Sequence, residues 1–176
     1  ELEPTQLYEV TTLLGSSLDL DWIFAQLGSK VVDLLDCAAS GIFLYNPQLE
    51  GLTFLRGLHL PAALTDNLLL KPGEGIAGRA YQTMRPAWTR DRLNDPSLAY
   101  TPAADQVLRA HGPRAYLAVP IVIRGEVLGV VVSCFREPHE VSGREGQLMT
   151  TLAGHAAIAM DNARHYEETR TQRVRL

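Results

Sequence analysis

Two long apolar runs separated by three turn residues constrain the fold of this chain more than any other feature. The runs cover residues 116–123 and 127–135, and Arg124-Gly125-Glu126 lies between them. Runs of this length around a short glycine-containing turn predict an antiparallel β-hairpin. Because almost every position in both runs is apolar, both faces of the sheet should be covered by other elements. Pro120 lacks a backbone donor, so it should lie at a sheet edge or at a bulge.

Weaker patterns place further elements before this hairpin. Residues 41–45 and 52–58 are apolar and flank the turn-rich segment 46–51, which predicts a second hairpin. Shorter elements are expected in the middle of the chain: helices over residues 61–67, 76–83 and 105–110, and a strand over 87–89. The remainder of residues 90–113 is irregular, and irregular sections of this length are usually functional or mobile.

Helical patterns occur at both ends of the chain. After Pro4, the residues Leu7, Val10 and Leu14 have the narrow spacing of a coiled-coil seam. A second helix is expected after Asp19 or Asp21, either of which can cap it. Its residues Ile23, Leu27, Val31 and Leu34 would share one face.

A long helix is expected to close the chain. Ser142 and Glu145 have the spacing of a capping box, which predicts the start of that helix. An apolar stripe then recurs at intervals of three and four residues and includes Leu152, Ala156, Ala159 and Ala163. Small side chains in this stripe would let another helix approach closely. Helices that bracket a largely antiparallel sheet define the α+β fold class.

Composition excludes several classes of partner and compartment. The formal net charge of −4 provides no basic field for nucleic acid. No apolar run approaches the roughly 20 residues that a membrane span needs, so no membrane contact is expected. Two cysteines without a CxxC pattern fit a reducing cytoplasm rather than a disulfide framework. Because the sequence begins without Met and ends in a polar helical run, we expect it to be a segment of a longer protein.

No pattern of catalytic or metal-ligating residues stands out. The segment 73–78 matches G-x-G-x-x-G, but the run before it is short and ends in Pro72. Dinucleotide binding needs a buried strand there, so glycines that serve a turn and close packing are the favoured interpretation. The five histidines lack metal-ligand spacing. Cys37 and Cys134 could be nucleophiles, but Cys134 lies in an apolar strand, where a free cysteine usually packs as a small hydrophobe.

Aromatic residues in or beside the irregular section are candidates for a pocket. Trp88, Tyr100 and Tyr116 each combine a large apolar ring with a polar end, which suits a ligand pocket. The same rings would suit a core lining equally well.

The order of the segments resembles that of the GAF domain family. The resemblance spans about residues 18–168 and is carried by residues 70–81, 90–91, 95–96, 117–121, 125–130 and 156–167. It implies a central antiparallel sheet of about five or six strands, with the N- and C-terminal helices on one face. The irregular section would form a pocket on the other face. It also implies a signalling helix over residues 1–17, a GAF domain over 18–166, and a helical linker over 167–176 to an output module such as a histidine kinase.

The resemblance implies a non-catalytic sensor and relay domain of a cytoplasmic signalling protein, which binds an unidentified small molecule. The candidate pocket residues are Trp88, Tyr100, His111, Tyr116 and Cys134. Haem is one cofactor option, because some haem-bearing GAF domains place an axial histidine near the position of His111. A homodimer is expected through the terminal helices, with Leu7, Val10, Leu14, Leu152, Ala156, Ala159 and Ala163 as relay residues. The alternatives are a thiol enzyme like free methionine sulfoxide reductase and a ligand-free dimerisation spacer.

Overall fold

The computed structural model describes residues 20–98 and 100–175, with residues 166–175 described as backbone alone. Six strands form one antiparallel sheet in the order β3-β2-β1-β6-β5-β4. The strands are β1 (Ala39–Asn46), β2 (Gly51–Leu58), β3 (Leu69–Leu70), β4 (Ala87–Thr89), β5 (Ala115–Ile123) and β6 (Glu126–Phe135). The helices are α2 (Leu20–Leu35), α3 (Ala62–Thr65), α4 (Gly75–Thr83), α5 (Pro102–His111) and α6 (Gly143–Arg175), with a 3-10 turn η1 (Arg92–Asn94). The predicted α+β class is therefore confirmed.

Both predicted hairpins are present, and they join through β1 and β6 at the middle of the sheet. Arg124 and Gly125 form the tight turn between β5 and β6, and both have a positive φ, at 52° and 79°. Two consecutive positive φ values twist a two-residue turn to match its strands, which explains the glycine. β4 pairs only with residues 116–118 of β5, so Pro120 lies beyond the end of that edge strand, just before a register shift after Ile121.

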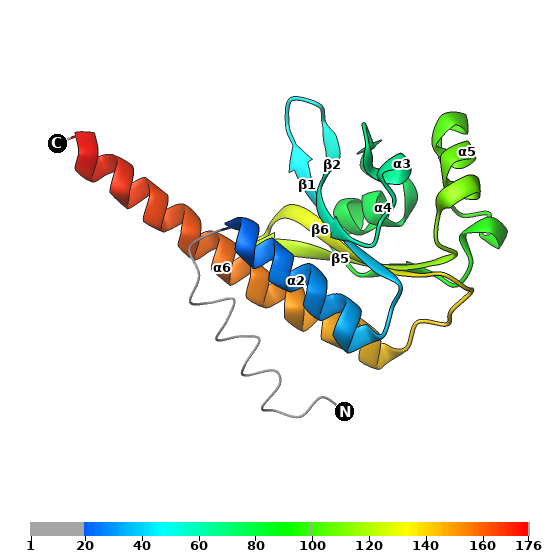
Figure 1. The fold of residues 1–176 in the computed structure, drawn as a ribbon. Helices are drawn as coiled ribbons and strands as arrows, with labels where there is room; N and C mark the ends of the chain where they lie inside the picture. The colour runs from blue at the N-terminus through cyan, green and yellow to red at the C-terminus, as the bar shows by residue number, and fades with distance from the viewer. Residues whose placement is uncertain (1–19, 99, 176) are drawn as a thin grey trace.

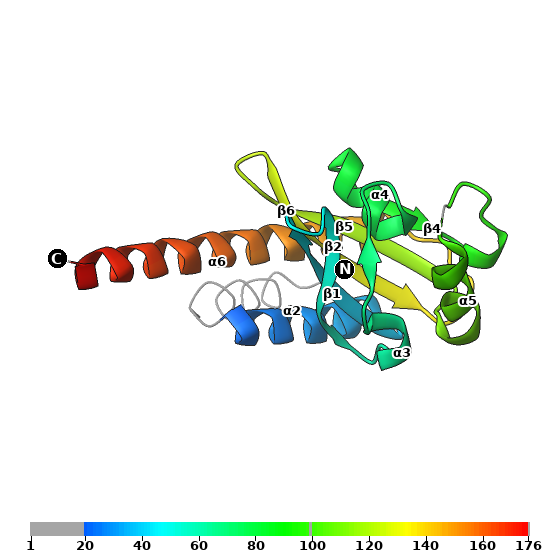
Figure 2. The same ribbon diagram turned by 90° about the horizontal axis from the view of Figure 1, so that it is seen from above.

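Helices cover the two faces of the sheet unequally. The long helices α2 and α6 run side by side across one face, whereas α3, α4 and α5 lie over the other (Figure 1, Figure 2). This is the predicted placement of the terminal helices. The sheet residues alternate accordingly: Val131 packs towards α2 and α6, whereas Val130 and Val132 pack towards the short helices. The strand period of two therefore builds two separate cores from one sheet.

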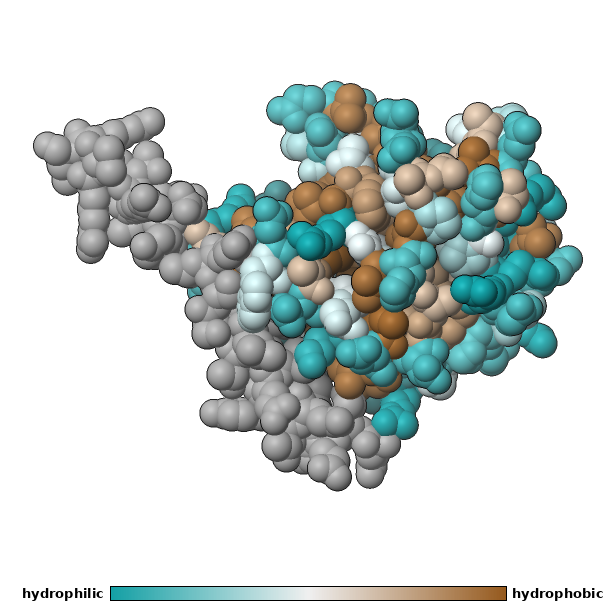
Figure 3. All heavy atoms as spheres, viewed as in Figure 1, coloured by the Kyte–Doolittle hydropathy of each residue, from teal (hydrophilic) through white to brown (hydrophobic). Residues whose placement is uncertain are grey.

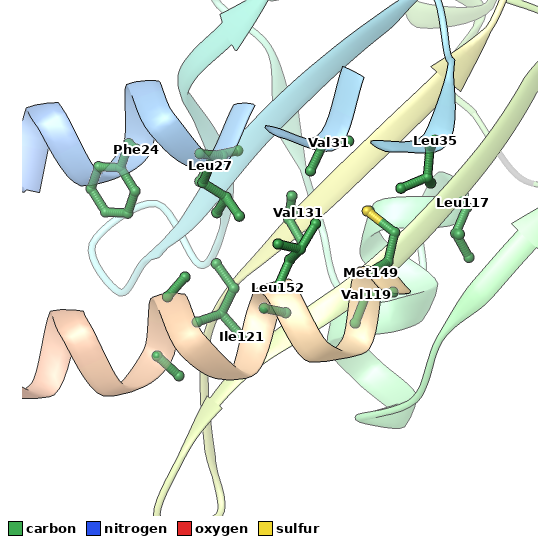
Figure 4. Close-up of a cluster of buried hydrophobic side chains, with 14 of the residues drawn as sticks. Phe24, Leu27, Val31, Leu35, Leu117, Val119, Ile121, Val131, Met149 and Leu152 are labelled. Carbon is green, nitrogen blue, oxygen red and sulfur yellow. The ribbon is translucent and has the colours of Figure 1, made fainter. Parts of the chain in front are cut away.

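The core between the sheet and α2–α6, here called the helix-side core, holds most of the largest fully buried side chains. Leu27 and Val31 of α2 meet Met149 and Leu152 of α6 there (Figure 4), and Ile23 of α2 belongs to the same core. The core on the opposite face, here called the cavity-side core, contains Phe43, Leu52, Leu70, Ile76, Ala77, Ala80, Ala118, Val130, Val132 and Cys134. β3, which was not predicted, contributes to this second core with only two residues. A strand of two residues is too short to produce a periodic pattern.

The start of α6 confirms the predicted capping box. The backbone N–H of Glu145 donates to Ser142 Oγ at 3.1 Å, and the N–H of Ser142 donates to the Glu145 carboxylate at 2.9 Å. The predicted stripe of Leu152, Ala156, Ala159 and Ala163 is buried within the chain. Leu152, Ala156 and Ala159 belong to the same core as the buried side chains of α2, and α2 and α6 are in contact within the chain.

Other predictions concern parts of the chain outside the described residues. The seam residues Leu7, Val10 and Leu14 lie outside the described residues, as do the side chains of the linker over 167–176. The limits of the three proposed segments therefore remain predictions. None of the described helices is both long enough and apolar enough to cross a membrane.

A candidate ligand cavity

A cavity of about 460 Å³ lies between the sheet and the short helices. Its floor is formed by Phe43 of β1, Tyr116 of β5, and Val132 and Cys134 of β6. Leu60, residues 63–71, the start of α4 and one side of α5 form its walls. Apolar side chains reach the surface between α3 and α5, among hydrophilic neighbours (Figure 3). A largely apolar cavity of this volume falls in the size range of small-molecule sites.

Two tyrosines, Tyr100 and Tyr116, line the part of the ligand cavity that is here called its inner end. Burial raises the pKa of Tyr100 to about 12, and burial raises the pKa of Tyr116 well above its usual value. Ile76, in the first turn of α4, and the charge of Arg92 oppose this effect of burial on the pKa of Tyr100, and Arg92 opposes it on Tyr116 as well, without cancelling it. Both hydroxyls therefore remain neutral and protonated at physiological pH.

Glycines at the start of α4 allow Tyr100 to approach. Gly73 and Gly75 have φ values of +85° and +65°, which glycine adopts at little cost. A Cβ on Gly75 would lie 2.9 Å from the ring of Tyr100, and one on Gly78 would lie 2.5 Å from the carbonyl oxygen of Lys71. The G-x-G-x-x-G segment thus serves a turn and close packing, as the favoured interpretation expected.

The loop after β4 is fixed by a bidentate ion pair. Asp91 accepts hydrogen bonds from Nε and Nη2 of Arg114 at 2.8 and 2.7 Å. The side chain of Asn94 donates to the same carboxylate at 2.6 Å. The Arg114 guanidinium, and secondarily Asn94, hold the pKa of Asp91 well below its usual range. In addition, the backbone N–H of Arg92 donates to the carbonyl of Arg114 at 2.7 Å, which fixes the backbone that presents Arg92.

Arg92 is a buried cation next to the cavity, and no sequence pattern pointed to it. Its side chain is only 2% exposed, and its nearest carboxylate oxygen, Oδ1 of Asp105, is 3.8 Å from its Nη1. Its Cζ lies 6.0 Å from the centroid of the Tyr100 ring. A single arginine in an irregular loop carries no periodic or spacing signal, so only the folded chain could place it.

The structure brings three of the five predicted pocket residues together. Tyr100, Tyr116 and Cys134 all line the ligand cavity. Trp88 does not: its side chain is 54% exposed and lies near Leu117 and the start of α6, on the opposite face of the sheet. His111 is exposed at the end of α5 and is not among the lining residues. Whether any of the five binds a ligand stays a prediction.

The two thiols are buried on opposite faces of the sheet. Cys134 belongs to the cavity-side core and Cys37 to the helix-side core. Burial raises the pKa of both thiols. The Cys37 thiol donates to the carbonyl of Ala39 at 3.3 Å. Within the described part of the chain, no group of three or more His, Cys, Asp or Glu side chains could hold a metal ion.

Comparisons with known proteins give a consistent family and fold. The sequence matches the GAF domain family over residues 8–160. It is 27% identical over 155 residues to a Nif-specific regulatory protein of Herbaspirillum seropedicae, a match that covers 86% of this chain and 28% of that protein. The chain spans about a quarter of the length of the curated relatives it matches.

Solved structures are similar over nearly the whole chain. The GAF domain of a phosphoenolpyruvate-protein phosphotransferase from Coxiella burnetii has a TM-score of 0.78 and 22% identity, with 93% of this chain and 95% of that chain covered. A free methionine-R-sulfoxide reductase from Neisseria meningitidis, solved with its substrate, has a TM-score of 0.77 and 15% identity over 91% and 89% of the two chains. At these identities the likeness shows a shared fold.

Proposed function

The chain belongs to the GAF domain family, and from that premise we propose that it is a non-catalytic sensor and relay domain of a cytoplasmic signalling protein. A small molecule binds in the ligand cavity and changes how α2 and α6 pack. Residues 167–176 pass that change to an output module such as a histidine kinase. The similarity to a Nif-specific regulatory protein supports a regulatory role.

The observation that carries this proposal is that β5 and β6 contribute side chains to both the cavity-side core and the helix-side core. Val132 and Cys134 line the cavity, whereas their neighbours Val131 and Phe135 pack in the helix-side core. A ligand that shifts these strands would therefore act directly on the surface beneath α2 and α6. Packed cores favour discrete arrangements over gradual deformation, which suits a switch between two packings.

The long C-terminal helix offers a route for the output. α6 packs against β5 and α2, and its C-terminal part extends away from the sheet in both ribbon views (Figure 1, Figure 2). Because the stripe of Leu152, Ala156 and Ala159 is occupied by contacts within the chain, these residues would relay the signal by repacking against α2. A homodimer through the terminal helices would then use the other faces of α6 and residues 1–17.

The thiol-enzyme alternative finds less support in the site. A cysteine nucleophile reacts as its thiolate, and burial raises the pKa of both Cys37 and Cys134. Their packing on opposite faces of the sheet also separates them from one common pocket. The structural likeness to a free methionine-R-sulfoxide reductase nevertheless makes a thiol-dependent turnover assay a useful control.

Thermal unfolding with a cellular extract tests ligand binding without knowledge of the ligand. The purified chain is mixed with the fraction of a bacterial extract that passes a small-pore filter, and bound mass is then identified by native mass spectrometry. A ligand at 100 times its Kd should raise the Tm by about 5–10 °C for a chain of this size. Native mass spectrometry of the same sample also reports whether the chain is a dimer.

Two matched variants assign the bound mass to the cavity. Val132→Phe places a ring on the cavity floor and should abolish both the Tm shift and the bound mass. Val122→Phe makes the same change at an exposed position of β5 and should preserve both. No shift and no bound mass in the wild type would favour the ligand-free spacer. A bound mass retained by Val132→Phe would place the ligand elsewhere.

A further inference from the structure

A positive charge that the protein compensates poorly lies next to the ligand cavity. Among the described residues, Nε of Arg92 is the one buried side-chain nitrogen or oxygen without a hydrogen-bond partner. The ion pair of Arg92 with Asp105 is long, at 3.8 Å, and Asp105 also pairs with Arg109 at 2.8 Å. A buried charge is costly unless it is paired and hydrogen-bonded, so Arg92 lacks part of the compensation that its burial requires.

The surroundings of Arg92 connect this charge to the cavity. Arg92 does not itself line the cavity, but its Cζ lies 6.0 Å from the centroid of the Tyr100 ring, and its charge acts on both Tyr100 and Tyr116, which do line it. Asp105 lies on α5 next to Ala104, which also lines the cavity. The guanidinium is therefore one side-chain layer behind the cavity wall.

The two tyrosine hydroxyls extend this charge towards the cavity. Because burial raises the pKa of both tyrosines, both phenols stay protonated. Each hydroxyl therefore keeps one hydrogen that it can donate to a ligand. Arg92 and the positive end of α4 both favour a negative acceptor for these hydrogens.

We infer that the cavity takes a small monocarboxylic acid with an apolar body, whose carboxylate accepts hydrogen bonds from Tyr100 and Tyr116 in front of Arg92. This inference rests on the proposed function, because it names the class of ligand for the same cavity. The apolar walls, with Leu64, Leu70 and Val107 among them, would enclose the body of the acid.

The balance of charges favours a carboxylate over a phosphate. One buried cation matches one negative charge, whereas a phosphate monoester carries close to two at neutral pH. The other charged lining residues are Asp66, Lys71 and Glu74. Asp66 and Lys71 are exposed, and the Glu74 carboxylate accepts from the backbone N–H of Lys71 at 3.3 Å, in the turn before α4. They place no second cation at the inner end.

The competing explanation is that Arg92 only holds α5 in place through Asp105 and Tyr100. That role predicts a loss of stability when Arg92 is replaced, but no change in which ligand chemistry the cavity prefers. Arg109→Gln is a matched control, because Arg109 pairs with the same Asp105 from the exposed side of α5. The ratio of two affinities in one variant separates the two explanations, since both ligands face the same fold.

The test uses matched acids and amides as probes. Phenylacetate and 4-methylpentanoate are titrated beside phenylacetamide and 4-methylpentanamide, with phenyl phosphate as a third chemistry. Binding is followed by ¹H–¹⁵N NMR, with the backbone amide of Ile76 as the reporter at the inner end. In the wild type each acid should bind at least about tenfold more tightly than its amide, because hydrogen bonds to a charged group are the stronger ones.

The variants make the inference falsifiable. Arg92→Gln should reduce the acid-to-amide affinity ratio to near one, Tyr116→Phe should lower it, and Arg109→Gln should leave it unchanged. If Arg92→Gln does not fold, Arg92→Lys keeps the charge, loses the planar donors and should still reduce the ratio.

Equal binding of acids and amides in the wild type, or tighter binding of phenyl phosphate, would overturn the inference and leave the sensor proposal intact. The same ratio in wild type and Arg92→Gln would assign Arg92 a structural role only and would also overturn it. If none of these probes shifts Ile76, the inference fails as well. The sensor proposal is then decided by the extract experiment, which assumes no ligand chemistry.

Discussion

At the scale of single residues, the ion pair of Asp91 with Arg114 controls where Arg92 lies. The pair joins the loop after β4 to Arg114, the residue just before β5. The backbone N–H of Arg92 also donates a hydrogen bond to the carbonyl of Arg114. A bidentate pair fixes the relative orientation of its two side chains in addition to attracting them. Loss of the Asp91 charge should therefore loosen the loop and the inner end of the cavity together.

Replacement of Asp91 by Asn should lower the free energy of unfolding near pH 7 and make that loss pH-dependent. The pKa of Asp91 is depressed in the folded state, so its stabilisation is present above the unfolded pKa of about 3.9 and is lost as pH falls further towards the folded pKa. Urea unfolding between pH 6 and pH 3 should show the gap between wild type and Asp91→Asn narrowing below about pH 4.

A neutralised carboxylate elsewhere provides the comparison for this experiment. Asp33→Asn changes an exposed position of α2 and should leave stability nearly unchanged across the same pH range. A gap for Asp91→Asn that is as large at pH 3 as at pH 6 would contradict the assignment to its ionised form.

For the strand residues of the site, the prediction succeeded where the pairing partner was also predictable. Tyr116 and Cys134 oppose each other across β5 and β6, so their shared face followed from the hairpin. Trp88 lies in a strand of three residues, in which Ala87 and Thr89 are buried and the tryptophan points to the other face. Nothing in three residues fixes that alternation in advance. Arg92 lies in a 3-10 turn, where its burial depends on Tyr100 and Asp105 from other elements.

At the scale of elements, local physics made the clearest predictions. The capping box at Ser142 and the tight turn at Gly125 depend on groups within four residues. The capping box occurs as predicted, and the predicted turn over 124–126 occurs with Glu126 already in β6. The stripe on α6 was predicted as a helix contact, but the sequence could not identify the partner helix. Small residues indicate close approach, whereas the choice between α2 and another chain depends on how the chain returns across the sheet.

Removal of the cap should destabilise the domain by a modest, defined amount. Ser142→Ala removes the acceptor for the N–H of Glu145 at the first turn of α6, which should cost about 1 kcal/mol. For a domain of this size the Tm should fall by about 2–4 °C in calorimetry. Thr150→Ala removes an exposed hydroxyl that bonds back to the Gly146 carbonyl within the same helix and should change the Tm less. Equal shifts for the two variants would contradict a special role for the cap.

At the scale of the whole molecule, the sheet is the layer between the cavity and the long helices. The sequence indicated that both faces of the β5–β6 hairpin would be covered, because its apolar runs lack alternation. Which helices cover which face depended on contacts distant in the chain, such as those between α2 and α6. The proposed relay depends on this layered arrangement, because a change on one face reaches the other through strands that carry both cores.

Overpacking between α2 and α6 tests that coupling from the helix side. Ala156 is fully buried in the helix-side core, so Ala156→Leu should force the helices apart and cost about 1–3 kcal/mol. Coupling between two sites is reciprocal, so a change imposed on the helices should also alter the cavity side of the sheet. Hydrogen exchange should accordingly rise in residues 62–70 and 102–111 as well as in α2 and α6. Ile158→Ala alters an exposed position on the same helix and serves as the control. It should change the free energy of unfolding by no more than about 0.5 kcal/mol and leave hydrogen exchange on the cavity side of the sheet unchanged. If the increase in hydrogen exchange caused by Ala156→Leu is confined to α2 and α6, the sheet does not couple the two cores. The relay must then run through residues outside this layer.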